Sequence, residues 1–88
     1  MDRLSAPGKR SEVICEEFDG EAILFDPLTN VTHRLNPTAA WIYFQCDGNT
    51  AREEIIGDYQ KTFGIDFEAA QRDVNQVIDQ LKKLSLFI

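Results

Sequence analysis

Cys15, Cys46 and His33 are the residues of this sequence best suited to covalent chemistry or metal binding. A thiol beside an imidazole can act as an activated nucleophile, and the two groups together bind zinc. Neither use is indicated, because a structural zinc site takes four such ligands and these three lie far apart in the sequence. We expect both cysteines to be small buried residues in a reducing compartment.

The other patterns that mark enzymes are not recognisable in this sequence. It shows no set of acid, base and nucleophile and no glycine-rich phosphate loop, and 88 residues leave little room for a closed pocket. We therefore expect a protein that is not an enzyme and that needs no metal or other cofactor.

The charge pattern argues against nucleic acid as a partner. Fifteen acidic residues outnumber nine Lys and Arg, giving a formal charge of −6, and the basic residues are too scattered to form a stripe. No apolar run approaches the roughly 18 residues that a membrane span needs, and no secretory signal is recognisable. We expect a cytoplasmic protein without membrane contact.

The first part of the chain reads as a small sheet. Apolar runs at 13–18 and 21–26 flank Asp19-Gly20, a strong signal for a two-residue hairpin turn. The turn "PLTN" at 27–30 then leads to a strand at 31–35. Residues 1–11 mix Pro7, Gly8 and charges without a period, so we expect a flexible tail before a domain at 12–88.

The second part reads as three helices. Asn36 and Pro37 begin a helix to about residue 46 that is apolar nearly all round, which predicts burial between the sheet and the later helices. Thr50 and Glu53 form a predicted capping box for a helix that ends at Gly64. Asp66 caps a third helix with an apolar stripe: Phe67, Ala70, Val74, Val77, Leu81 and Leu84. The sequence predicts an α+β fold, a three-stranded antiparallel meander followed by three helices.

Several segments resemble the PqqD family of pyrroloquinoline quinone biosynthesis. The resemblance runs from about residue 23 to 88 and rests on "LNPTAAWIYFQCDG", "TAREEI" and "DVNQVIDQLKKL". Tyr43 in place of tryptophan, Gln45 in place of an apolar residue and a closing segment at 85–88 without glycine depart from the family pattern. Because similar domains occur in other ribosomal-peptide pathways, including lasso-peptide systems, the branch of the family stays open.

The resemblance implies a winged helix-turn-helix-like domain that binds the leader of a ribosomally synthesised precursor peptide. Such a domain is a peptide chaperone without catalytic activity of its own. In the quinone pathway it presents the peptide to a radical S-adenosylmethionine enzyme with iron–sulfur clusters. The leader is implied to add a strand beside the third strand and against the third helix.

The two edges of the predicted sheet differ in a way that agrees with this implication. The first strand carries Glu12, Glu16 and Glu17, which discourage pairing with another chain. The third strand has no acid and no proline, and its main chain could bond an added strand: Val31, Thr32, His33, Arg34 and Leu35. The alternative is an edge covered by the N-terminal tail or by a second copy in a weak homodimer.

The third helix would form the side wall of this site. Its apolar stripe is flanked by Asp73, Gln80 and Leu84 on one side and by Gln71, Asn75 and Lys82 on the other. The family's Asp-Val pair, here Asp73-Val74, favours the first flank, and Val77 belongs to the stripe between the flanks. Asp73 either contacts the leader or is simply solvated.

Two side chains of the third strand have assigned directions. His33 shares a face with Val31 and Leu35, which predicts a partly buried core histidine. Arg34 points the other way, toward an acidic leader residue or toward solvent.

A winged-helix DNA-binding regulator is the main alternative function, since three helices and a small sheet also describe that class. The helix that would read DNA, residues 67–84, carries equal numbers of acidic and basic residues: Glu68, Asp73 and Asp79, and Arg72, Lys82 and Lys83. DNA-reading helices concentrate positive charge, so this alternative is disfavoured.

Overall fold

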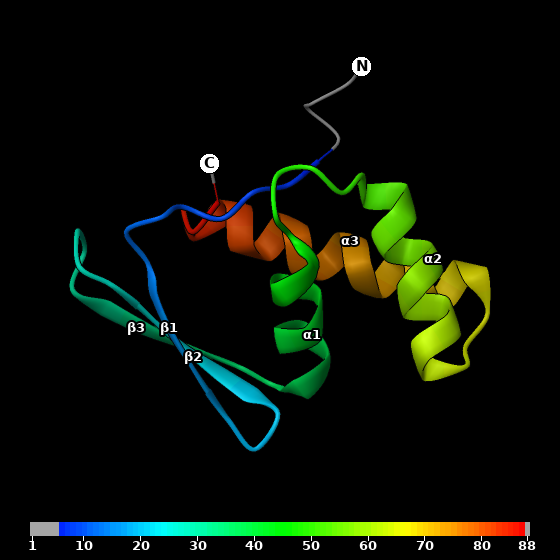
Figure 1. Ribbon diagram of the computed structural model, residues 1–88, viewed down its shortest axis with the longest axis horizontal. Helices are drawn as coiled ribbons and strands as arrows, with labels where there is room; N and C mark the ends of the chain where they lie inside the picture. The colour runs from blue at the N-terminus through cyan, green and yellow to red at the C-terminus, as the bar shows by residue number, and fades with distance from the viewer. Residues whose placement is uncertain (1–5, 88) are drawn as a thin grey trace.

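A three-stranded antiparallel sheet is followed by three helices in the computed structural model, which describes residues 6–87 (Figure 1). The strands are β1 (Ile14–Phe18), β2 (Glu21–Asp26) and β3 (Val31–Leu35), in that spatial order. The helices are α1 (Pro37–Gln45), α2 (Arg52–Phe63) and α3 (Phe67–Lys83). The predicted α+β fold class is confirmed.

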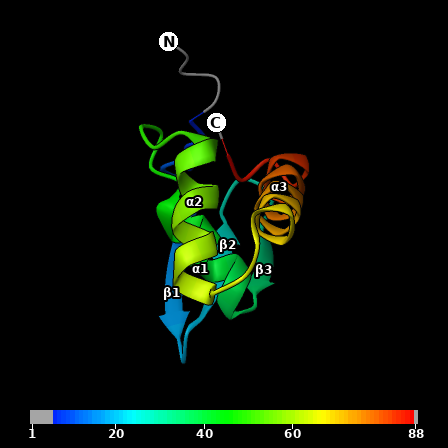
Figure 2. The same ribbon diagram turned by 90° about the vertical axis from the view of Figure 1, so that its right-hand side faces the viewer.

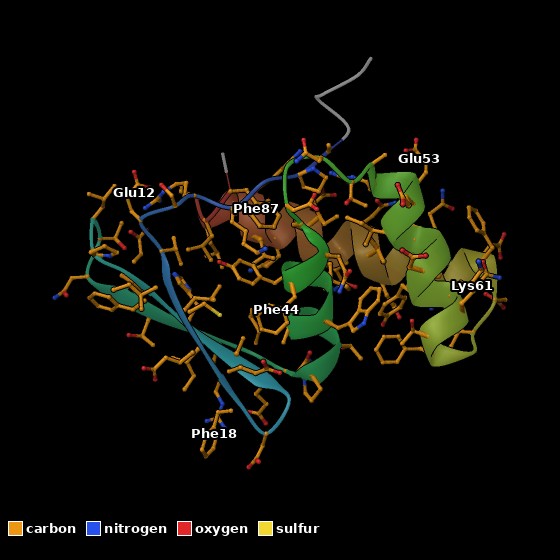
Figure 3. All side chains as sticks on the ribbon, in the orientation of Figure 1. Glu12, Phe18, Phe44, Glu53, Lys61 and Phe87 are labelled. Atoms are coloured by element: carbon orange, nitrogen blue, oxygen red, sulfur yellow. The ribbon has the colours of Figure 1, made fainter. Side chains whose placement is uncertain are left out.

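The turns follow from residues that adopt a left-handed backbone. Asp19 and Gly20 both have positive φ, at 53° and 81°, as a two-residue hairpin turn requires. Phe18, next to this turn, is 62% exposed and projects from the hairpin away from the helices (Figure 3). Gly64 has φ 63° and ends α2, as predicted.

Helix α1 lies at the centre of the molecule because it is apolar nearly all round. It contacts β2 and β3 on one side and α2 and α3 on the other, and Ala40 and Ile42 are wholly buried. Its N-cap is Asn36, whose side chain accepts a hydrogen bond of 2.9 Å from the Ala39 amide. The predicted buried helix is confirmed.

The predicted capping box of α2 is wrong. The N-cap residue is Ala51, and Thr50 belongs to a turn around Asp47. The Asp47 carboxylate accepts hydrogen bonds from the Asn49 and Thr50 amides, both 2.8 Å, and from the Thr50 hydroxyl. These local bonds lower the pKa of Asp47 and hold Thr50 in the turn, while α2 begins at Arg52 and has Ala51 as its N-cap.

The structure differs from the expected loose tail for residues 7–10, while residues 1–5 lie outside the described residues. Gly8 forms a bridge with Asp47, and Lys9 forms one with Phe87. The Arg10 guanidinium donates two hydrogen bonds, of 2.8 and 3.1 Å, to the buried carboxylate of Asp26. The Arg10 amide also donates to the Leu86 carbonyl at 3.1 Å, which holds the segment across the C-terminal end of the chain. The bonds that the Arg10 guanidinium donates lower the pKa of Asp26.

Candidate functional site

Strand β3 has one free edge within the part of the chain that the structure describes. It bonds β2 on one side, and neither the other strands nor the isolated bridges of residues 6–87 reach its outer edge. The packed segment at residues 7–10 joins the loop after α1 and the C-terminal end instead. An extended chain could therefore bond the outer edge of β3.

Helix α3 lies across from this free edge. Figure 2 shows α3 and β3 on one side of the molecule and α2 and β1 on the other. Between β3 and α3 lies an open groove of about 650 Å³. Its lining comes from β3, the start of α1, α2 and α3: Thr32, His33, Arg34, Leu35, Asn36, Thr38, Ala39, Tyr59, Asp73, Gln76, Val77, Gln80, Leu81 and Leu84. We call this space the β3–α3 groove.

All the predicted site residues except Val31 line the β3–α3 groove: Thr32, His33, Arg34, Leu35, Asp73, Val77, Gln80 and Leu84. Val31 lies at the start of β3, 43% exposed and outside the lining. The flank of α3 with Asp73, Gln80 and Leu84 is the one that faces β3. On the other flank Asn75 accepts a hydrogen bond of 2.9 Å from Arg52 of α2. Peptide contact by these residues stays a prediction.

The two side chains with predicted directions lie as follows. His33 is half-buried, as predicted, and stands opposite Leu24 of β2 in the strand register. The Arg34 guanidinium, predicted to point toward an acidic leader residue or toward solvent, bonds the Glu21 carboxylate at 2.7 and 2.8 Å. The Glu21 carboxylate therefore compensates the positive charge of Arg34, although the Arg34 side chain is 71% exposed.

Asp73 brings a carboxylate to one end of the groove. The hydroxyl of Tyr59 donates a hydrogen bond of 3.3 Å to Asp73 Oδ2, and the Asp73 side chain remains 39% exposed. Tyr59 itself is buried and packs against Trp41 and Phe63, with ring centroids 5.6 and 4.6 Å away. Burial, and secondarily the Asp73 carboxylate, raise the pKa of Tyr59, so the hydroxyl stays a donor at neutral pH.

Sequence reasoning missed six lining residues, most of which carried a usable signal. Gln76 and Leu81 are neighbours of Val77 and Gln80 at helical spacing, and Asn36, Thr38 and Ala39 directly continue β3. Tyr59 comes from α2, and its spacing indicated only a place on the apolar face of that helix. Its position in the groove depends on how α2 packs on α3, which periodicity does not encode.

The residues considered first for covalent chemistry lie elsewhere. Cys46 is wholly buried, as predicted, and its thiol donates to the carbonyl oxygen of Ile42 at 3.2 Å. The expectation for Cys15 is wrong, since it lies exposed on β1, a strand whose residues are all exposed. Within residues 6–87, no three His, Cys, Asp or Glu side chains gather as metal ligands would. No helix of that region combines the length and apolar character needed to cross a membrane.

Comparisons with known proteins bear on this arrangement. Two solved structures share the fold: "TbiB1 in Complex with the TbiA(beta) Leader Peptide", with a TM-score of 0.82, and "Lasso peptide synthetase B1 complexed with the leader peptide", with 0.83. Both are 19% identical in sequence; the first alignment covers 91% of this chain and 93% of the other, the second 94% and 98%.

Among curated protein sequences, none matches this chain. The family model described as "Coenzyme PQQ synthesis protein D (PqqD)" matches residues 21–86, which include β2, β3 and all three helices. This chain therefore belongs to the PqqD family.

Proposed function

We propose that this protein is a peptide adaptor, which binds the leader of a ribosomally synthesised precursor and presents it to a modifying enzyme. The leader would pair with the outer edge of β3 as a fourth strand, and α3 would form the side wall. Main-chain hydrogen bonds would supply affinity, and the groove would select alternate side chains of the guest. The observation that carries the proposal is the free β3 edge beside a groove open to solvent.

The comparisons support the same proposal from another side. The two structures with this fold were each solved with a leader peptide, according to their names. We propose that this chain uses its fold for a ligand of the same class. A disordered leader must be ordered on binding, which costs about 2 to 5 kcal/mol of the gross interaction. The expected affinity is consequently moderate, which suits release to an enzyme.

Two kinds of modifying enzyme are candidates for receiving the leader from this protein. The family description favours pyrroloquinoline quinone biosynthesis, with a radical S-adenosylmethionine enzyme as partner. The lasso synthetase likeness favours a lasso-peptide pathway instead. The genes beside this one decide between them, since a radical enzyme gene and a lasso cyclase gene are readily told apart. We propose the radical S-adenosylmethionine enzyme as the first candidate partner to test.

The decisive experiment maps amide shifts of the isotopically labelled protein during titration with a synthetic leader. The probe is the N-terminal half of the short peptide encoded nearest to this gene, and a scrambled peptide of equal composition is the control. We expect shifts in β3, the start of α1 and the groove-facing side of α3, with β1 unaffected. Shifts centred on β1, or equal effects of the scrambled peptide, would contradict the proposal.

A weak homodimer is compatible with this function if two copies pair through β3. Sedimentation of the free protein would then show a dimer that the leader dissociates. A duplex-DNA mobility shift that weakens with salt would instead support the DNA-binding alternative.

A further inference from the structure

The two ends of the β3–α3 groove differ in chemistry. Arg10 bonds both Asp26, which pairs with Val31, and the carbonyl of Ser85, so the start of β3 lies near the end of α3. The opposite end of the groove holds the Tyr59–Asp73 hydrogen bond. Strand β3 and helix α3 therefore run in opposite directions, so that the apolar side chain of Leu84 lies at one end of the groove and the Asp73 carboxylate at the other.

Charge is distributed just as unevenly in the groove. The Arg34 guanidinium is held by Glu21, and Arg72 contacts Asp73 only at 3.8 Å from a side chain that is 71% exposed. Tyr59 gives Asp73 a neutral donor rather than a positive charge. The carboxylate of Asp73 is thus poorly compensated, in a chain whose formal charge is −6. A positive charge on the guest would find its complement here.

The length of the groove limits how many guest residues face α3. From Asp73 to Leu84 the helix rises about 16 Å, at 1.5 Å per residue. A strand covers that length with about five residues, of which alternate side chains point to the same face. About three guest side chains would therefore face α3. Those over Val77, Leu81 and Leu84 meet apolar atoms, and the one at the other end meets Asp73.

We infer that the recognised segment of the guest alternates two apolar side chains with outward-facing residues and ends in a Lys or Arg beside Asp73. The inference rests on the proposed strand addition and adds the sequence class of the peptide. The basic residue lies at the end of the segment that pairs near Leu35. Its position in the peptide, first or last, reports whether the guest strand runs parallel or antiparallel to β3.

The test uses a random twelve-residue peptide display library selected on the immobilised full-length protein. Wild type should enrich two apolar residues at alternate positions, followed or preceded two positions away by Lys or Arg. Asp73→Lys should enrich Asp or Glu at that position, and Asp73→Asn, which keeps an acceptor for Tyr59, should lose the preference. Asp58→Lys makes the same charge change at an exposed site on α2 outside the groove and should select like wild type.

An individual peptide gives the expected size of the effect. Replacing its Lys or Arg by Ala should weaken binding to wild type about two- to fivefold, as for a partly exposed ion pair. The same replacement should have no effect on binding to Asp73→Asn. The difference should shrink as salt is raised, because the pair is open to solvent.

The outcomes separate this inference from the proposed function. A groove variant, Val77→Asn, tells whether enriched peptides occupy the β3–α3 groove. If it selects the same peptides as wild type, or if wild type enriches none, the strand-addition proposal is overturned. If enrichment needs Val77 but shows no basic position, or if Asp73→Lys leaves that position basic, only the present inference is overturned.

Discussion

The apolar middle of the β3–α3 groove offers the sharpest test of guest binding, through Val77→Asn. Val77 is half-buried at the edge of the core and faces the groove from α3. In the free protein an asparagine there stays hydrated, so folding should lose only about 1 kcal/mol of stability from the missing apolar contact. Circular dichroism and a urea titration would check that the variant is folded.

The bound state should be affected far more, because a guest strand would cover position 77. Desolvating an unpaired amide costs about 1 to 3 kcal/mol, and the lost apolar contact with the guest adds about 1 kcal/mol. A total of about 2 to 4 kcal/mol corresponds to binding that is roughly 30- to 1,000-fold weaker. Isothermal titration calorimetry with the leader, or with a peptide selected on wild type, measures this ratio.

Gln71→Asn is the matched control for this variant. It places the same residue on α3, at an exposed position outside the groove lining. Its affinity should equal that of wild type within a factor of about two. If both variants bind like wild type, the guest does not cover the α3 wall and the reasoning is refuted. If both variants lose binding equally, the loss reflects a general disturbance of α3 and not a guest contact at position 77.

Three further predictions concern the fold. Ile42→Ala should cost about 2 to 5 kcal/mol in urea unfolding, because Ile42 is wholly buried in α1, whereas Ile14→Ala on exposed β1 should cost about 1 kcal/mol or less; equal losses would argue against the buried central helix. The Arg10 bonds lower the pKa of Asp26 below its unfolded value near 4, so their stabilisation should be complete above about pH 4 and vanish as pH falls through the lowered pKa. Urea midpoints from pH 7 to 2 should therefore fall more steeply for wild type than for Asp26→Asn, and parallel curves would contradict that assignment. Burial raises the pKa of Cys46 to about 12, so a thiol reagent should label only Cys15 in the native protein and both cysteines in urea; rapid native labelling of Cys46 would show that α1 opens.

Local signals in the sequence were sufficient for most of the fold. Asp19-Gly20, Asn36-Pro37, Gly64 and Asp66 each act within a few residues, and each marks the turn or helix end that was predicted. The failure at Thr50 is also local, because Asp47 competes for its amide and hydroxyl. Short-range chemistry of this kind is readable from sequence when one partner dominates and misleading when two compete.

Contacts between distant segments account for what the sequence did not predict. Arg10 meets Asp26 and Ser85 only after folding, so the composition of residues 7–10 indicated a loose segment. The position of Tyr59 in the groove likewise depends on a contact between distant segments, the packing of α2 on α3. The predicted flank of α3 does face β3, yet the stripe's periodicity is equal on both flanks and only the family's Asp-Val pair favoured Asp73.

The two walls of the β3–α3 groove come from residues 31–35 and 67–83, which lie far apart in the chain, and neither wall is a complete surface alone. A denatured molecule has no such surface, so a guest that binds there binds only native molecules. By mass action, a guest at a hundred times its dissociation constant would add about 2.7 kcal/mol to the free energy of unfolding. Cargo would in this way protect its own carrier from thermal denaturation and from proteases, and an empty carrier would be the more short-lived of the two.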